Sequence, residues 1–237
     1  MKLSILRKLV ASRAERRPFA LLTDMVSGAQ WLVFAAGDAY GGDAGQTEPS
    51  GEIVATARRF LQEQRSSVAD MAGSRYLVQV HAPPARLLVV GAVHIAQALL
   101  PMAELAGFRV FLIDPREAFS APERFPGIEM IRDWPDLGLE TLSPDVSTAV
   151  VTLSHDPKID DPALRVALAS DAFYIGALGS RKTHAARLKR LSAMGIADEA
   201  LERIHAPVGL KLGGRKPAEI AISILAQIVE ARYRRHG

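Results

Sequence analysis

The sequence predicts an α/β protein in which a Rossmann-like, doubly wound parallel sheet follows a smaller N-terminal α+β domain. From residue 85 onward, apolar and partly β-branched runs alternate with helix-length segments, which is typical of parallel strands with helices on both faces. The first of these runs leads into Gly91 and a helical stretch, and the second ends at Asp114. This βαβ pattern is typical of a nucleotide-binding turn.

The smaller domain is predicted over residues 1–84. Leu3, Leu6 and Val10 give the first segment an apolar helical stripe, and Pro83-Pro84 punctuates the chain at the end of the domain. The expected elements are a helix over 3–16, strands over 19–26 and 31–35 with a hairpin turn at 27–30, a loop over 37–51, a helix over 51–65 and a strand over 76–80.

The Rossmann-like domain is predicted over residues 85–237. Pro101 is expected to kink the helix after Gly91, and Pro217 to open the last helix at its first turn. Asp160 or Asp161 is the expected cap of a helix over 160–169. The remaining predicted elements are strands over 87–90, 110–114, 128–132, 148–153 and 173–177, and helices over 180–194 and 198–204.

Composition excludes several classes of function. The 237 residues contain no cysteine, so disulfides, thiolate metal sites and cysteine nucleophiles are absent, in agreement with a cytoplasmic protein. A net charge of +3 is too small to indicate nucleic-acid binding. Arg7 and Lys8 interrupt the first apolar run, which is unlike a signal peptide, and the apolar region 87–112 contains too many polar residues for a membrane span.

The glycine fingerprint of the turn is incomplete. Gly91 permits the tight turn and Ala96 permits close packing of helix and strand, but Val93 occupies the place where a glycine lets backbone approach a pyrophosphate. Ordinary NAD(P) binding is therefore the less favoured expectation. If a dinucleotide does bind, Asp114 favours NAD over NADP, because its carboxylate repels a 2′-phosphate.

In an open parallel sheet, ligands bind beyond the carboxyl ends of the strands. The best candidate there is Gly179-Ser180-Arg181, which with the following Lys182 puts a hydroxyl, two cations and unpaired N–H groups at one helix start. Lys211 and Arg215 flank a glycine pair in a loop that could cover the same edge. The predicted cofactor-binding residues are Gly91, His94, Asp114, Arg116, His155, Asp156, Gly179, Ser180, Arg181, Lys211 and Arg215.

Purely structural roles remain open for four of these residues. Asp114 could cap the turn before Pro115, His155-Asp156 could form a turn, and His94 could be an exposed helix-start residue. No metal-ligand spacing and no general base with a matched partner is present. We therefore expect neither a metal site nor a catalytic residue.

Several longer blocks carry a family resemblance that covers residues 86–237. They are Gly91-Ala-Val-His-Ile-Ala-Gln-Ala, Asp114-Pro-Arg, Glu123-Arg-Phe-Pro, Leu153-Ser-His-Asp-Pro-Lys-Ile-Asp-Asp-Pro-Ala-Leu, Tyr174-Ile-Gly-Ala-Leu-Gly-Ser-Arg-Lys-Thr-His, His205-Ala-Pro-Val-Gly-Leu and Pro217-Ala-Glu-Ile-Ala. At these residues the chain resembles the XdhC/CoxI family, the accessory proteins of xanthine dehydrogenase and related molybdenum hydroxylases.

The resemblance implies a Rossmann-like domain that binds molybdenum cofactor (molybdopterin) and delivers it to an apo molybdenum hydroxylase of the xanthine dehydrogenase or CO dehydrogenase type. A cysteine desulfurase or other maturation proteins are further implied partners, and assembly as a homodimer is open. The sequence departs from the family at Val93, where glycine is usual. In the first domain only Ser27-Gly28 and Gly41-Gly42 remain of the family's loops, and its cysteine is missing.

Three functional hypotheses follow. The leading one is a cofactor-binding maturation factor, because an anion-binding edge without reactive side chains suits binding and handover. The second is an NAD(P)-dependent oxidoreductase. The third is a non-catalytic scaffold for hydroxylase assembly.

Overall fold

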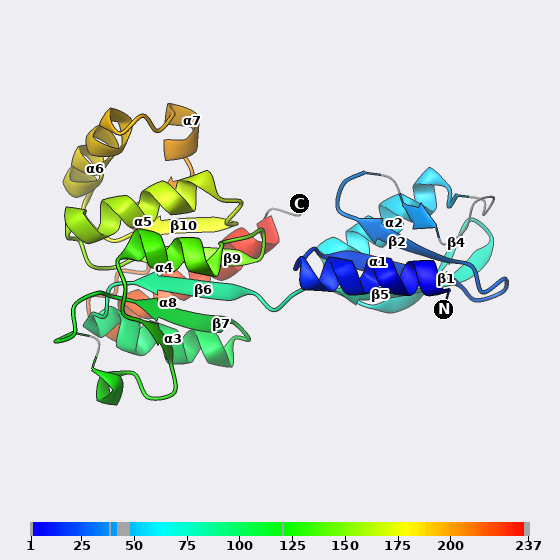
Figure 1. Cartoon of the computed structure of the whole chain (residues 1–237), viewed down its shortest axis with the longest axis horizontal. Helices are drawn as coiled ribbons and strands as arrows, with labels where there is room; N and C mark the ends of the chain where they lie inside the picture. Colours follow the sequence, from blue (N-terminus) through cyan, green and yellow to red (C-terminus); the bar gives the residue numbers. More distant parts are fainter. Residues whose placement is uncertain (1, 38, 42–47, 120, 235–237) are drawn as a thin grey trace. The chain divides into compact units, whose positions relative to one another are not determined.

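The computed structural model describes residues 2–37, 39–41, 48–119 and 121–234 (Figure 1). Between Pro83 and Pro84 the chain divides into two compact units. None of the helices in the described ranges combines the length and the apolar character that crossing a membrane requires.

The N-terminal unit is an antiparallel sheet in the order β3-β2-β1-β5-β4. Along β1, Phe19 and Leu21 belong to one apolar cluster and Ala20 and Leu22 to another, because successive side chains point to opposite faces. The first cluster includes residues of α1 and the second includes residues of α2, so the two helices cover opposite faces. The elements are α1 (Leu3–Ala14), β1 (Phe19–Asp24), β2 (Gln30–Phe34), β3 (Tyr40–Gly41), α2 (Gly51–Gln62), β4 (Ser67–Met71) and β5 (Ser74–His81).

This arrangement confirms the smaller α+β domain. The hairpin turn between β1 and β2 is as predicted: the Asp24 carboxylate accepts the N–H of Val26 at 2.8 Å, and Gly28 has a φ of +72°. Strands β3 and β4 were not predicted. β3 falls inside the expected loop over 37–51, whose residues 42–47, including the second glycine of Gly41-Gly42, lie outside the described residues.

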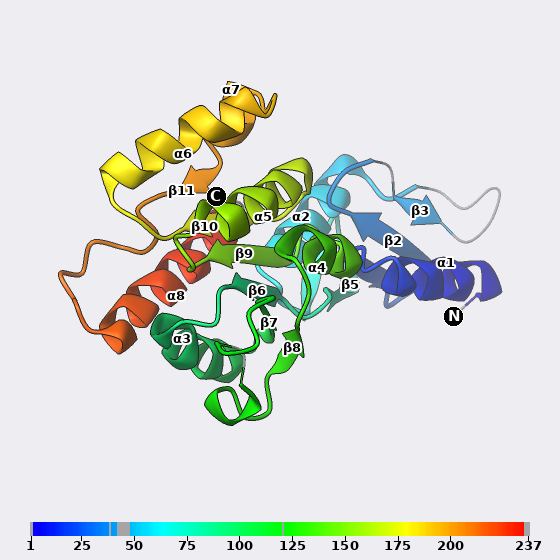
Figure 2. The same ribbon diagram turned by 60° about the vertical axis from the view of Figure 1, so that its left-hand side comes forward.

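The C-terminal unit is a parallel sheet in the order β11-β10-β9-β6-β7-β8 (Figure 2). Counted from β6, this is the strand order 3-2-1-4-5-6 of a Rossmann fold, whose direction of winding reverses between β6 and β9. The strands are β6 (Arg86–Val90), β7 (Arg109–Ile113), β8 (Glu129–Ile131), β9 (Thr148–Thr152), β10 (Tyr174–Ala177) and β11 (Ile204–His205).

Helices cover both faces of this sheet, which confirms the doubly wound prediction. Leu87 and Val89 of β6 share one core cluster with α3 and α8, whereas Leu88 and Val90 share the other with α4, α5 and α6. The helices are α3 (His94–Leu105), α4 (Pro135–Leu142), α5 (Pro157–Ala169), α6 (Arg181–Ala193), α7 (Asp198–Leu201) and α8 (Pro217–Arg234), with a 3₁₀ turn over Pro122–Arg124.

Two predicted helix boundaries of this unit are wrong. α5 begins at Pro157 with Asp156 as its cap, because proline fits the first helical position and the Asp156 carboxylate accepts the N–H of Lys158 at 3.0 Å. Asp160 and Asp161 are therefore inside the helix, where they form ion pairs. The helix predicted over 198–204 ends at Leu201, because Ile204 pairs with Ile175 of β10 and extends the sheet.

Candidate functional site

The turn after β6 has the backbone of a Rossmann turn. Gly91 has a φ of +110°, and a Cβ atom on it would lie 2.8 Å from the main-chain nitrogen of Ser154. Glycine is thus required both for the backbone conformation and for the close approach of the neighbouring chain. The next residue, Ala92, donates its N–H to the Asp114 carboxylate at 2.7 Å.

Asp114 is fully buried and bonded within the protein. Besides the Ala92 N–H, its carboxylate accepts hydrogen bonds from Arg116 through the main-chain nitrogen at 2.9 Å, Nε at 2.9 Å and Nη2 at 2.8 Å. Burial alone would raise the pKa of Asp114, but these hydrogen bonds outweigh it and hold the pKa below its usual value. Four accepted bonds fill the lone pairs of a carboxylate, so ribose hydroxyls would have to compete for them.

The side chains of the other predicted residues at this end of the sheet, His94, His155 and Asp156, share no hydrogen bond with one another. His94 is exposed at the first position of α3, and His155 is exposed with a φ of +53°. Within the described ranges, neither imidazole has a hydrogen bond to another group. The Asp156 carboxylate caps α5 by accepting the N–H of Lys158. No group of three or more potential metal ligands occurs among the described residues.

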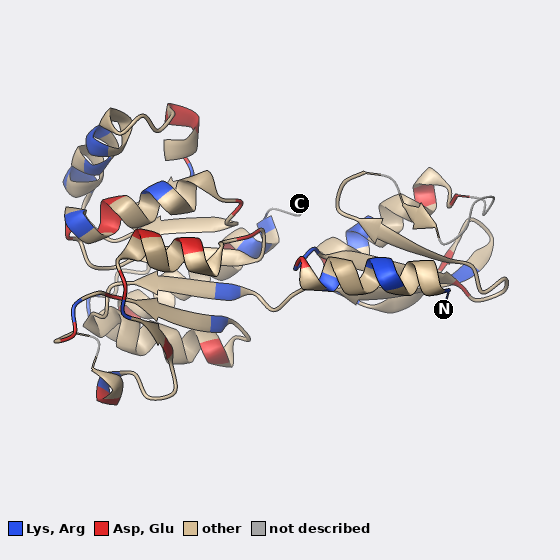
Figure 3. Cartoon of the chain, viewed as in Figure 1, with Lys and Arg blue, Asp and Glu red and all other residues tan. Residues whose placement is uncertain are grey.

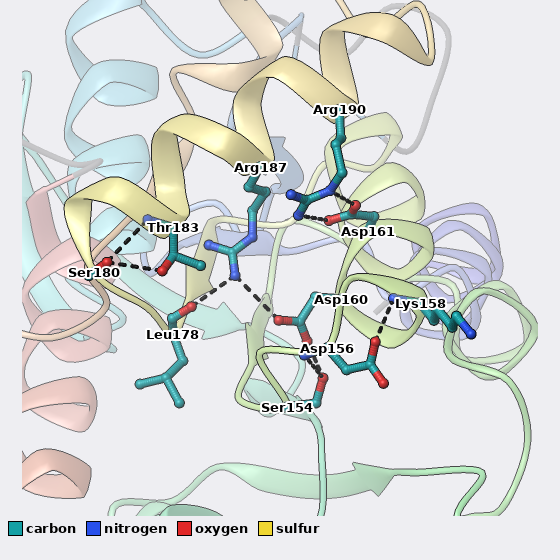
Figure 4. A network of polar contacts seen from close by, with 10 residues as sticks. All are labelled: Ser154, Asp156, Lys158, Asp160, Asp161, Leu178, Ser180, Thr183, Arg187 and Arg190. Atoms are coloured by element: carbon teal, nitrogen blue, oxygen red, sulfur yellow. Dashed lines mark hydrogen bonds and ion pairs between the residues drawn. The ribbon is translucent and has the colours of Figure 1, made fainter.

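A buried polar network connects this edge with the start of α6 (Figure 4). Ser154 donates its hydroxyl to Asp160 at 2.6 Å, and Arg187 lies 3.3 Å from the other oxygen of the same carboxylate. Arg187 also donates to the main-chain carbonyl of Leu178 at 2.8 Å. Burial raises the pKa of Asp160, although Ser154 and Arg187 oppose this effect.

A helix starts after Gly179-Ser180, as predicted, and the binding of an anion there stays a prediction. Ser180 caps the helix by accepting the N–H of Thr183 at 3.1 Å, and Gly179 has a φ of +142°. The helix contains five arginine and lysine residues and no acid over Arg181–Ala193, as the blue segments of α6 in Figure 3 show. Arg187 and Arg190 pair with acids of α5, whereas Arg181 is exposed.

A cavity of about 1070 Å³ opens beside this turn, at the carboxyl ends of β10 and β11. Among the described residues that line it, Arg181 and Lys211 are cations and none is an aspartate or glutamate. Arg215 is not part of the lining; its main-chain N–H and that of Lys216 donate to the Glu219 carboxylate. Of the predicted cationic residues, the cavity thus brings Arg181 and Lys211 together.

Two lining residues, His205 and Gln227, and the buried Tyr174 that contacts both were not predicted as site residues. Gln227 accepts at Oε1 both the Tyr174 hydroxyl and the Gly209 N–H, each at 2.7 Å. The His205 ring stacks on the buried Tyr174 ring with centroids 4.7 Å apart and an angle of 14° between the planes. The available signal was the His205-Ala-Pro-Val-Gly block, which contributed only to the family resemblance. Gln227 lies on α8 beyond the Pro217-Ala-Glu-Ile-Ala block, so no motif includes it.

The comparisons with known proteins agree with this fold. Residues 87–228 match the family model of the XdhC Rossmann domain. The chain belongs to the XdhC family. Over 228 residues it is 29% identical to the uncharacterized protein YqeB of Escherichia coli, covering 88% of this chain and 41% of that protein.

Two other relatives have functional names. The molybdenum cofactor insertion chaperone PaoD of Escherichia coli is 40% identical over 88 residues, which are 37% of this chain and 28% of that protein. A probable xanthine dehydrogenase subunit of Bacillus subtilis is 32% identical over 156 residues, 64% of this chain and 44% of that protein. The chain thus spans less than half the length of these curated relatives.

A solved structure supports the fold independently. The crystal structure of a xanthine dehydrogenase from Bacillus halodurans matches with a TM-score of 0.69 at 21% sequence identity, covering 99% of this chain and 69% of that one. At this identity the match shows the fold alone.

Proposed function

We propose that this protein is a maturation factor that binds molybdenum cofactor and hands it to a molybdenum hydroxylase of the xanthine dehydrogenase or CO dehydrogenase type. Its membership in the XdhC family and its likeness to a cofactor insertion chaperone support this function. A cysteine desulfurase or another maturation protein would be a further partner, and a homodimer is compatible with the proposal.

The observation that carries the proposal is the charge of the cavity beside α6. Arg181 and Lys211 line it, and none of its described lining residues is an aspartate or glutamate, so an anion gains attraction from both cations there. The N-terminus of α6 adds main-chain N–H groups and a favourable helix dipole. The cofactor's phosphate would bind between these groups.

A dinucleotide-dependent oxidoreductase is less well supported. The Asp114 carboxylate, which would hold the ribose, already accepts four internal hydrogen bonds, and Val93 is the residue that precedes α3 in the turn. Of the predicted residues at that turn, Gly91, Asp114 and Arg116 accordingly have a structural role in this proposal, and His94 is assigned none.

Equilibrium dialysis of the purified protein against released molybdenum cofactor under anaerobic conditions tests the function. We expect saturable binding by the wild type and at least about a tenfold loss in Arg181→Glu, because a charge-assisted hydrogen bond contributes roughly 1.5–3 kcal/mol and about 1.4 kcal/mol is a factor of ten.

Lys189→Glu is the matched control, since it makes the same charge change on the same helix but lies at a different hollow, beside α7. Its affinity should stay within about twofold of the wild type. Absence of cofactor binding by the wild type, alone or with a client hydroxylase, would refute the proposed function. Equal losses in both variants would show that net charge, and not this cavity, binds the anion.

A further inference from the structure

The ring of Tyr174 covers one face of the His205 imidazole. Tyr174, which is 1% exposed, lies flat beneath the ring at 4.7 Å between centroids. His205 itself is exposed and lines the cavity. Its position is fixed by the sheet, because β11 pairs with β10 at His205 and Gly176. The protein therefore presents a flat, supported aromatic face to the cavity.

Gln227 presents hydrogen-bond donors to the same cavity. A main-chain N–H can only donate, so the atom that receives the Gly209 N–H at 2.7 Å must be the amide oxygen of Gln227. The Tyr174 hydroxyl occupies the same oxygen. The amide nitrogen, with two donors, has no acceptor among the described residues, and Gln227 lines the cavity. A ligand edge rich in acceptors would satisfy it.

The loop that completes the cavity is held in place by close packing. Gly209 has a φ of +97°, and a Cβ atom there would overlap the Ser223 hydroxyl of α8. The neighbouring walls at Val208, Leu210 and Ile220 are apolar. A volume of about 1070 Å³ suits a small-molecule ligand, since ligand pockets measure roughly 300–1,000 Å³.

The ionisation of His205 agrees with a stacking role. Burial lowers the pKa of His205, and the nearby Glu230 opposes this effect only in part. The lowered pKa favours the neutral ring near pH 7. A neutral imidazole supported by Tyr174 offers a π face for offset stacking. The two cations of the cavity, Arg181 and Lys211, remain for a separate anionic group of the ligand.

We propose that this cavity binds a planar nitrogen heterocycle that stacks on His205, places acceptor atoms against the Gln227 amide and directs an attached phosphate to Arg181 and Lys211. The inference rests on the proposed function, in which the heterocycle is the pterin of the molybdenum cofactor. It divides recognition into a ring subsite and a phosphate subsite that can be tested separately.

Fluorescence titration with 6-hydroxymethylpterin, a phosphate-free pterin, tests the ring subsite. We expect saturable binding by the wild type, at least a fivefold loss in His205→Ala and near wild-type binding in His205→Phe, which retains an aromatic face. Gln227→Glu should also lose at least fivefold, because it keeps the acceptor for Tyr174 and Gly209 but removes the two donors. Arg181→Glu should bind this pterin within twofold of the wild type.

The outcomes separate this inference from the proposed function. If Arg181→Glu loses cofactor binding while His205→Ala and Gln227→Glu bind both pterin and cofactor like the wild type, the ring subsite is refuted and the function stands. Absence of saturable pterin binding by the wild type also refutes the ring subsite. Melting temperatures identify variants that fail to fold, and Gln227→Glu decides the question if His205→Ala is one of them.

Discussion

Asp160 and Arg187 form a buried ion pair of 3.3 Å, with their side chains 1% and 2% exposed. Asp160 also binds Ser154, whose main chain lies against Gly91, and Arg187 also binds the carbonyl of Leu178, which lines the cavity. The pair therefore joins the end of β9 to the turn before α6. Neither residue lines the cavity in which we propose that the phosphate binds; both hold the backbone beside it.

Replacing Arg187 by methionine should destabilise the protein by about 3–5 kcal/mol, because Asp160 is then left as a buried charge without its partner. Urea unfolding at pH 7 measures the effect. The double variant Asp160→Asn with Arg187→Met is the control, and it should be more stable than Arg187→Met alone. A loss below about 1 kcal/mol in the single variant would contradict the buried pair.

Asp114→Asn should cost about 1–3 kcal/mol near neutral pH, because the carboxylate accepts charge-assisted hydrogen bonds from Arg116. The pKa of Asp114 is lower in the folded protein than its usual 3.8, so its stabilisation is present above that value and lost as pH falls through the folded pKa. Unfolding free energies of both proteins should therefore converge below pH 3.8. A difference independent of pH would argue against an ionised, bonded Asp114.

Val93→Gly should lower the melting temperature without creating nucleotide binding. Val93 packs against the core beside α3. Replacing it by glycine removes apolar contact in the folded state and increases the conformational entropy of the unfolded chain, which together should lower the free energy of unfolding by about 1 kcal/mol. In this variant the Ala92 N–H still donates to the Asp114 carboxylate, so it is not free to bind a pyrophosphate. Calorimetric titration with NADH next to thermal melts checks both statements, and saturable micromolar binding of NADH by the variant would show that the turn is a usable pyrophosphate cradle.

Gly209→Ala and Gly213→Ala form a matched pair in the cavity loop. Both glycines have positive φ, +97° and +83°, so each alanine bears a similar backbone cost of about 1–2 kcal/mol. Only at Gly209 does the added Cβ meet another group, the Ser223 hydroxyl, whereas nothing lies within 4 Å at Gly213.

Gly209→Ala should therefore lower the melting temperature more than Gly213→Ala. It should also weaken cofactor binding, because the loop must shift away from Gln227. Thermal melts and dialysis of the two variants side by side measure these effects. Equal behaviour would mean that the loop adapts freely to the extra methyl group.

The sequence was sufficient for the fold because its strongest signals are local. The apolar runs before Gly91, Asp114 and Ser154 are strands buried on both faces, and such strands have the continuous hydrophobic pattern that predicts them. The short strands β3 and β11 were missed, because a strand of two residues has no hydrophobic periodicity. Each forms by pairing with a neighbouring strand, β2 for β3 and β10 for β11.

The candidate site was only partly predictable. Ser180 and Arg181 were proposed because a helix start has a recognisable pattern, and Lys211 because it adjoins a glycine pair; the structure places Arg181 and Lys211 at one cavity. The packing of α8 beside the 204–214 segment decides which of the predicted residues share a cavity. This packing depends on long-range contacts, and no local sequence pattern predicts it. The partnership of Tyr174 with Gln227 likewise joins residues 53 positions apart.

The two-residue strand β11 places the proposed ligand against the edge of the sheet, because His205 belongs to this strand and lines the cavity. Ile204 and His205 hold this edge through their pairing with β10, and an edge this short opens easily to solvent. A molecule resting on His205 would have to leave before the edge could open, so slower amide hydrogen exchange at these two positions would report occupancy of the cavity without any label on the ligand.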